Sequence, residues 1–293
     1  MEFVKYQLTD GHLNGAHHRF IQPPQVAYFV STVDQFGNVN ITPTTMGTAI
    51  GHNFFSFTLS NLFEENWDQR KYNYRDGIKQ GYCNLEETPE CVISYYGHNL
   101  LRESWIAGMP IPKGISEIDV MGLTALPSEQ VKPAGIAECP INLEAKVLHK
   151  NYLGKRWVNY ICEVVGVTVH KELDERNRRE PYAGYGVMLI DPILEIFIGK
   201  GGTPETDNIR LVYDRLDWDK IERCPEEIGC KEEWIGTFKQ WMHDEQARGN
   251  VTQEDVERLF TLESKWAANR DPIANADVKK ELTQLIKKVV SKK

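Results

Sequence analysis

The sequence predicts a mainly β protein, an antiparallel barrel followed by a helical appendage. Two observations lead to this fold class. Stretches rich in β-branched and aromatic residues recur through the first two-thirds of the chain, with few long helical patterns between them. From about residue 205 onward, apolar residues instead recur at helical spacing. Many strands with little intervening helix favour an antiparallel barrel over a doubly wound sheet.

The first predicted element is a β-hairpin. Residues 25–34 (QVAYFVSTVD) are apolar and β-branched and predict a strand. Residues 35–38 (QFGN) carry a turn signal, and residues 39–41 (VNI) predict the returning strand.

Further strands and helices follow along the first two-thirds of the chain. Strands are predicted at residues 53–60, 90–96, 141–150, 157–170 and 193–199. An amphipathic stretch at about 75–88 and a shorter one near 99–107 predict helices.

The last third changes to helical patterning. Helices are predicted at 231–249, at 251–270 and at 276–290, and Thr252 with Asp255 resembles a capping box. We therefore divide the chain into a barrel domain, residues 1–204, and a helical C-terminal extension, residues 205–293. The tail exposes a stripe that must pack on its own barrel or on a partner's, and we expect the partner's. The stripe consists of Trp234, Phe238 and Trp241.

Charge and composition exclude several classes of protein. The net charge of −8 argues against a nucleic-acid binder, and the lysines near the C-terminus fit a solvated helix face. The N-terminus has no signal-peptide pattern, and Asp191, Pro192 and Glu195 interrupt the longest apolar stretch. We expect a soluble protein with no membrane span.

The cysteines indicate a reducing compartment. The six cysteines show no Cys-x-x-Cys spacing, which favours reduced thiols and a cytoplasmic location. They are Cys83, Cys91, Cys139, Cys162, Cys224 and Cys230. A metal site at Cys224 and Cys230 lacks local partners, and His17-His18 is expected to be a surface pair.

Nucleotide-binding glycine motifs are missing from the sequence. It contains no Gly-x-Gly-x-x-Gly and no P-loop, and residues 199–203 (GKGGT) lack the P-loop spacing. Hydroxyl residues cluster instead at 42–48 (TPTTMGT) and at 58–61 (TLSN), after two neighbouring strands. These two strand ends could converge on one polar ligand, although threonine is also simply a good strand residue.

Three segments resemble the flavin reductase-like, FMN-binding split-barrel family, and the flavoredoxin-like branch is the nearest. Residues 24–47 are similar to the opening of that family, with Ser-Thr-Val-Asp followed by Gly-Asn-x-Asn and Pro. Residues 122–147 carry its Gly-Leu-Thr, Val-Lys-Pro, Ile-Ala-Glu and Leu-Glu groups in order. Residues 79–94 resemble its helix-and-strand stretch, which typically begins Lys-Asp-Thr. Together the matches span about residues 20–200.

The resemblance implies a homodimer with FMN bound at its interface. It places the flavin against the first loop and the end of the following strand, with a lysine near the phosphate. By position these residues are Thr44, Thr45, Met46, Gly47, Thr48, Thr58, Leu59, Ser60, Asn61 and Lys79.

The chain departs from the family pattern at one phosphate position. The family's Asp-Thr is Gln80-Gly81 here, so a phosphate-binding hydroxyl is missing. The loop between Ser60 and Lys79 is longer than usual and carries basic residues that could replace the lost contact. They are Arg70, Lys71 and Arg75.

The resemblance implies an oxidoreductase in which NAD(P)H reduces bound FMN. Electrons would then pass to free flavin, to a carrier protein or to a small-molecule acceptor. The cofactor carries this chemistry, so we assign no catalytic side chain. Two alternatives stay open: an FMN-bearing electron carrier without nicotinamide activity, and a barrel that has lost its flavin and serves as a binding module.

Overall fold

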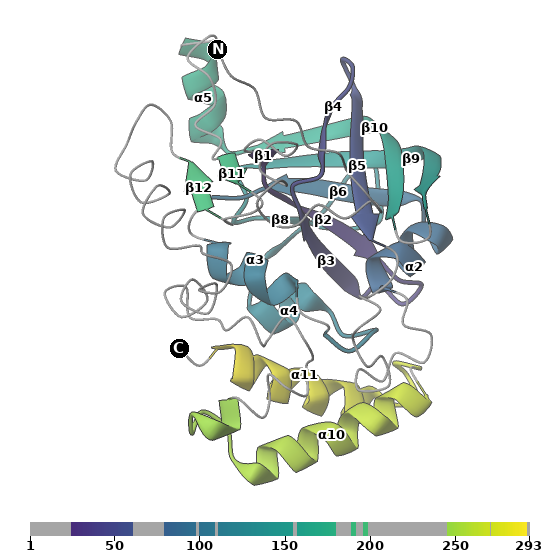
Figure 1. The fold of residues 1–293 in the computed structure, drawn as a ribbon, viewed down its shortest axis with the longest axis vertical. Coiled ribbons are helices and arrows are strands. Elements are labelled where there is room, and N and C mark those ends of the chain that lie inside the picture. The colour runs from purple at the N-terminus through teal and green to yellow at the C-terminus, as the bar shows by residue number, and fades with distance from the viewer. Residues whose placement is uncertain are drawn as a thin grey trace, which may run out of the picture.

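A curled sheet and a pair of C-terminal helices form the two ends of the molecule (Figure 1). The structure is a computed structural model, and it describes residues 25–60, 79–97, 100–108, 111–154, 157–179, 189–191, 196–198, 245–269 and 271–291. The two tail helices are α10 (Gln253–Ala268) and α11 (Ala276–Ser291). Short helices lie between them and the sheet.

The main sheet has seven strands, and every neighbouring pair is antiparallel. In spatial order the strands are β3 (Val39–Thr44), β2 (Tyr28–Val33), β6 (Glu90–Tyr95), β9 (Ile141–Leu153), β10 (Trp157–Val169), β5 (Phe54–Ser60) and β4 (Gly47–Ala49). Only Thr45 and Met46 separate β3 from β4 in the sequence, yet these strands lie at opposite edges. The sheet must therefore curl until its edges approach, which confirms the predicted antiparallel split-barrel architecture.

The predicted first hairpin is present, with its turn where the sequence places it. Strands β2 and β3 pair from Tyr28↔Thr44 to Val33↔Val39. The Asp34 carboxylate accepts hydrogen bonds from the backbone N–H groups of Phe36 and Asn38, both at 2.9 Å. Gly37 has a φ of +84°, a conformation that glycine adopts without strain.

The long predicted strands are confirmed as β5, β6, β9 and β10, and the predicted helices near 75–88 and 99–107 as α2 (Gln80–Glu87) and α3 (Leu101–Ala107). The strand expected at 193–199 is present in part as β12 (Ile196–Ile198). It belongs to a separate small sheet with β1 (Gln25–Val26) and β11 (Leu189–Asp191). The elements that the sequence did not predict are mostly short: β4, β11, α4 (Glu117–Met121), β7 (Ala125–Leu126), β8 (Gly135–Ile136) and α5 (Lys171–Arg179).

Two apolar clusters stabilise the barrel. The first fills its interior, where Phe57 and Tyr160 stack with ring centroids 5.3 Å apart and Leu85 of α2 closes one end. The second lies between β2 and β3 on one side and α3 and α4 on the other, and it includes Phe29 and Ile118. Helix α4 is therefore held against the outside of the first hairpin.

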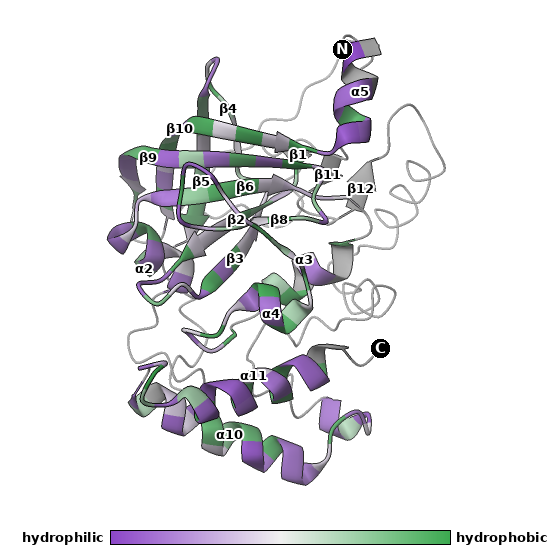
Figure 2. Ribbon diagram, turned by 180° about the vertical axis from the view of Figure 1, so that it is seen from behind, coloured by the Kyte–Doolittle hydropathy of each residue, from purple (hydrophilic) through white to green (hydrophobic). Residues whose placement is uncertain are grey.

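The tail helices make a third apolar cluster with the segment around α4. Residues of α10 and α11, among them Leu259 and Leu282, pack with Ile111, Ile115 and Val120 of the same chain. Figure 2 shows that both helices carry hydrophilic as well as hydrophobic residues, as expected of helices with one covered face. The apolar faces of α10 and α11 are thus covered by their own chain. The expectation that the tail packs on a partner through its aromatic stripe stays a prediction. The stripe formed by Trp234, Phe238 and Trp241 lies outside the described residues.

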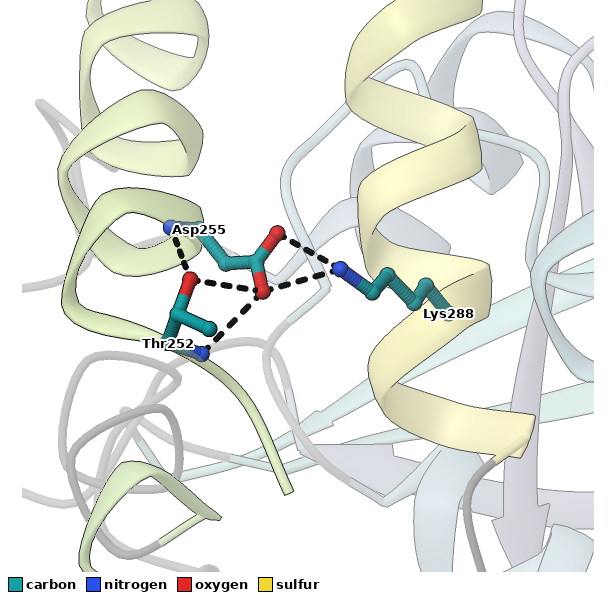
Figure 3. A network of polar contacts seen from close by, with 3 residues as sticks. All are labelled: Thr252, Asp255 and Lys288. Carbon is teal, nitrogen blue, oxygen red and sulfur yellow. Dashed lines mark hydrogen bonds and ion pairs between the residues drawn. The ribbon is translucent and has the colours of Figure 1, made fainter. Parts of the chain in front are cut away.

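The predicted capping box at the start of α10 is confirmed. The Thr252 hydroxyl accepts from the Asp255 N–H at 3.1 Å, and the Asp255 carboxylate accepts from the Thr252 N–H at 3.1 Å. Lys288 of α11 donates to both oxygens of the same carboxylate (Figure 3). One carboxylate therefore caps α10 and ties it to α11.

Several predicted features lie outside the described residues: His17-His18, the segment 199–203, Cys224, Cys230 and the boundary near residue 204. The four cysteines within the described part, Cys83, Cys91, Cys139 and Cys162, are free thiols. No helix among the described residues is long and apolar enough to cross a membrane.

Candidate functional site

The two hydroxyl-rich strand ends lie next to each other. Strand β4 pairs with β5, so that Gly47 faces Phe57 and Thr48 faces Ser56. The N–H of Thr58 donates to the carbonyl oxygen of Met46 at 2.7 Å. The structure therefore brings the loop Thr44–Thr48 alongside Thr58, as the convergence hypothesis requires.

Tight backbone contacts shape this loop. The Thr44 hydroxyl accepts a hydrogen bond from the N–H of Met46 at 3.1 Å. A Cβ on Gly47 would lie 2.1 Å from the Tyr28 hydroxyl and 2.4 Å from the carbonyl oxygen of Ser56. Only glycine fits at position 47, because β4 passes directly over the Tyr28 side chain of β2 where the sheet curls.

The strand end contributes alternate residues to the outer face of the barrel. Thr58 and Ser60 are half-buried on this face, whereas Leu59 is buried in the interior cluster. The side chain of Leu59 therefore faces away from the hydroxyls, and only its backbone remains available to a ligand on the outer face. Asn61 lies outside the described residues.

Two residues of β10 extend the polar surface and were not predicted from the sequence. Asn159 lies opposite Thr58 and donates to the hydroxyls of Ser56 at 2.8 Å and Thr58 at 3.1 Å. Trp157 lies opposite Ser60 and is 38% exposed. In the sequence, only the alternation along the predicted strand 157–170 indicated which face these side chains lie on. That this strand pairs with β5 is seen only in the structure.

Helix α2 lies across the end of the barrel and begins next to Lys79. The Tyr82 hydroxyl lies 3.4 Å from that of Tyr152 at the end of β9, and Glu86 pairs with Lys150 at 2.8 Å. Lys79 occupies the N-cap position in an extended conformation, with no side-chain cap. A helix N-terminus carries partial positive charge and unpaired N–H groups, so it favours an anion at this place.

The Gln80-Gly81 departure has a structural reason. The side-chain oxygen of Gln80 accepts a hydrogen bond from the N–H of Gly114 at 3.0 Å. A Cβ on Gly81 would lie 2.8 Å from both the Thr42 hydroxyl and the Asn40 side-chain oxygen. The space of the family's threonine side chain is therefore taken by Thr42 and Asn40. The alternative basic residues Arg70, Lys71 and Arg75 lie outside the described part.

A buried carboxyl group holds the residues of β3 that pack against Gly81, and it was not identified from the sequence. Glu117 of α4 accepts from the Asn40 side chain at 2.7 Å and from the Ile41 N–H at 2.5 Å. Burial raises the pKa of Glu117 to about 8, although both hydrogen bonds act to lower it. Glu117 thus fixes α4 to β3 and holds Asn40 next to Gly81.

The donor set suits a phosphorylated, planar ligand rather than a metal ion. Hydroxyls, amide groups, helix N–H groups and one ammonium group are donors that bind phosphate and carbonyl oxygens. Within the described ranges, no group of three or more His, Cys, Asp or Glu is placed to hold a metal ion. The residues present are therefore compatible with the phosphate and carbonyl oxygens of a flavin cofactor.

Comparison with known proteins gives one match by sequence family. Residues 22–186 match the family described as "Flavin reductase like domain". Among curated proteins, the uncharacterized protein YdfE of Bacillus subtilis is 29% identical over 43% of this chain and 62% of its own length. The alignments with two further relatives, from Pyrococcus abyssi and Archaeoglobus fulgidus, cover 51% and 64% of their lengths.

Solved structures with a similar arrangement are more distant in sequence. Nitrilotriacetate monooxygenase component B from Bacillus cereus is 18% identical, with a TM-score of 0.49 over 59% of this chain and 85% of that chain. Flavoredoxin of Desulfovibrio vulgaris is 17% identical, with a TM-score of 0.47 over 68% of this chain and 94% of that chain.

Proposed function

Because the chain belongs to the flavin reductase-like family, we propose that it is an FMN-binding oxidoreductase. NAD(P)H reduces the bound flavin, and the electrons pass to free flavin, a carrier protein or a small-molecule acceptor. The observation that carries this proposal is the family match over residues 22–186, together with the adjacent hydroxyls of β4 and β5 and the lysine at the start of α2.

The residues at this surface would divide between the two parts of the cofactor. Lys79 and the first N–H groups of α2 would hold the phosphate, since they combine an ammonium group with a helix N-terminus. The hydroxyls of Thr44, Thr45, Thr48, Thr58 and Ser60, with the backbone of Met46 and Gly47, would contact the ring system. Bound flavin would supply the hydride and electron chemistry, while these residues bind and orient it.

FMN is favoured over FAD by the absence of a dinucleotide motif and by the single lysine at the start of α2. The sequence contains no dinucleotide fingerprint, and a single helix start with one lysine suits a terminal phosphate. We expect acid release and chromatography of the flavin from reconstituted protein to yield FMN.

We further propose that the protein acts as a homodimer. Trp157 and Leu153 are paired neighbours on the outer face, 38% and 53% exposed, and Trp157 lies directly opposite Ser60. Large apolar side chains beside a polar site are well suited to be covered by a second copy. The partner would then exclude water from the flavin ring.

Replacing Lys79 with alanine tests the proposed site. We expect Lys79→Ala to weaken FMN binding by roughly 1.5–3 kcal/mol, the scale of a charge-assisted hydrogen bond. Riboflavin lacks the phosphate and should bind to the variant and the wild type about equally. Fluorescence titration with both ligands makes the comparison.

Lys150→Ala is the matched control. It removes a lysine charge of β9 that lies beside the far end of α2, where Lys150 pairs with Glu86. We expect it to leave both affinities nearly unchanged. An equal loss of FMN and riboflavin in Lys79→Ala would instead mean that Lys79 acts through the fold, and the phosphate assignment would fail.

A further inference from the structure

Trp266 of α10 connects the C-terminal extension to the segment before α4. Among the residues that the structure describes, it is the largest fully buried side chain, with 1% exposed. Its indole N–H donates to the carbonyl oxygen of Lys113 at 2.8 Å, across 153 positions in the sequence. The tail helix therefore fixes the backbone of a loop that lies between it and the barrel.

Gly114 continues this connection. Its φ of +82° lies in the left-handed region, and a Cβ would lie 3.1 Å from the Cζ2 atom of Trp266. The glycine therefore allows the loop to turn while resting against the indole ring. In this position the N–H of Gly114 donates to the side-chain oxygen of Gln80 at 3.0 Å.

Gln80 is the first residue of α2 and the neighbour of Lys79. A hydrogen bond to its side chain restrains the first turn of the helix, where the proposed phosphate site lies. The same turn is restrained at Gly81, against which Thr42 and the Glu117-bound Asn40 pack. Gly114 and Glu117 take part in these two supports, and they lie in the segment 111–120 that the tail helices cover.

We propose that Trp266 and Gln80 are positioning residues, through which the C-terminal helices set the first turn of α2 and thereby the affinity for the flavin phosphate. This inference rests on the proposed function. It gives the tail a role at the cofactor site without any contact with the cofactor. It also explains why this chain carries Gln80-Gly81, since the glutamine is needed as the acceptor for Gly114 and the glycine for close packing.

Two variants of the full-length chain break the connection at its ends. Gln80→Met removes the acceptor while keeping the length of the side chain, and Trp266→Phe removes the indole N–H while keeping an aromatic ring. We expect each to weaken FMN binding by roughly three- to tenfold, the effect of one hydrogen bond. Riboflavin affinity should change by less than about twofold, because the ring contacts do not involve α2.

The double variant separates a connected path from two independent defects. If the residues act in series, Gln80→Met combined with Trp266→Phe should bind FMN about as well as either single variant. If the losses of FMN affinity in the two single variants multiply in the double variant, the inference is overturned. Equal losses of FMN and riboflavin affinity would also overturn it. Unchanged FMN binding in Gln80→Met would overturn it as well, even if Trp266→Phe proves too unstable to measure.

The control is Lys288→Met, which removes the ion pair with Asp255 that ties α10 to α11. It should lower the free energy of unfolding but leave FMN affinity unchanged. A wild type that binds FMN no better than riboflavin would refute the proposed phosphate site and this inference together. A wild type that prefers FMN, with variants that keep the full preference, would refute the inference alone.

Discussion

At the scale of single residues, the polar surface combines positions that the sequence reveals with positions that only the fold brings in. The threonines and serine of the two strand ends stood out because hydroxyls cluster there. Leu59 was included with them, but alternation along β5 turns its side chain into the barrel. Asn159 and Glu117 could not be found, because their partners lie 101 and 77 positions away in the sequence.

Glu117 gives a prediction about pH. Its pKa is raised from 4.5 to about 8, so the folded protein retains a proton that the unfolded chain has already lost. Between about pH 4.5 and pH 8, stability therefore falls as pH rises, by at most about 1.4 kcal/mol per pH unit from this group. Replacing Glu117 with Gln should flatten that part of the profile.

Urea unfolding of both proteins across this pH range measures the difference. Glu103→Gln, on α3, is the control. It makes the same chemical change but keeps the hydrogen bonds that Asn40 and Ile41 donate to Glu117. Parallel profiles for the wild type and Glu117→Gln would show that Glu117 is ionised in the fold, contrary to its burial.

At the scale of elements, length set much of what could be predicted, although the nine-residue α5 was also missed. The strands β5, β6, β9 and β10 have six to thirteen residues, enough to show a pattern. Strands β7 and β8 have two residues each and α4 has five, too few for any periodicity. They form because the surrounding packing holds them, as when Glu117 and Ile118 fix α4 to the first hairpin. The start of helix α10 could be predicted because a capping box involves residues only three positions apart.

The cap of α10 carries the prediction at this scale. Hydrogen bonds from Lys288 and Thr252 lower the pKa of Asp255 from 3.8 to about 2, so its contribution is present above about pH 4 and is lost toward pH 2. Asp255→Ala should reduce the free energy of unfolding at neutral pH by about 1–2 kcal/mol. The difference from wild type should shrink at about pH 3.

Thr252→Ser preserves the hydroxyl and should match the wild type in the same denaturation experiment. If Asp255→Ala were as stable as wild type at neutral pH, the cap would contribute nothing to the tail.

At the scale of the whole molecule, the tail helices form a layer beneath α4 and reach the barrel through it (Figure 1). The sequence indicated helices with one apolar face, but a periodic pattern does not say which surface covers that face. Contacts such as Trp266 with Lys113 decide this, and they join segments 153 positions apart. The division into residues 1–204 and 205–293 remains a prediction, because its boundary falls outside the described residues.

Anaerobic reduction of the FMN-reconstituted protein tests the central claim most directly. NADH and NADPH are added in turn, and the visible absorbance of the flavin is followed. We predict that at least one nicotinamide bleaches the flavin, because the proposed activity is hydride transfer to bound FMN. The contradicting result is a flavin that stays oxidised with both nucleotides while dithionite bleaches it, which would make the protein an FMN-bearing electron carrier. A protein that binds no FMN under reconstitution would contradict the flavin site itself.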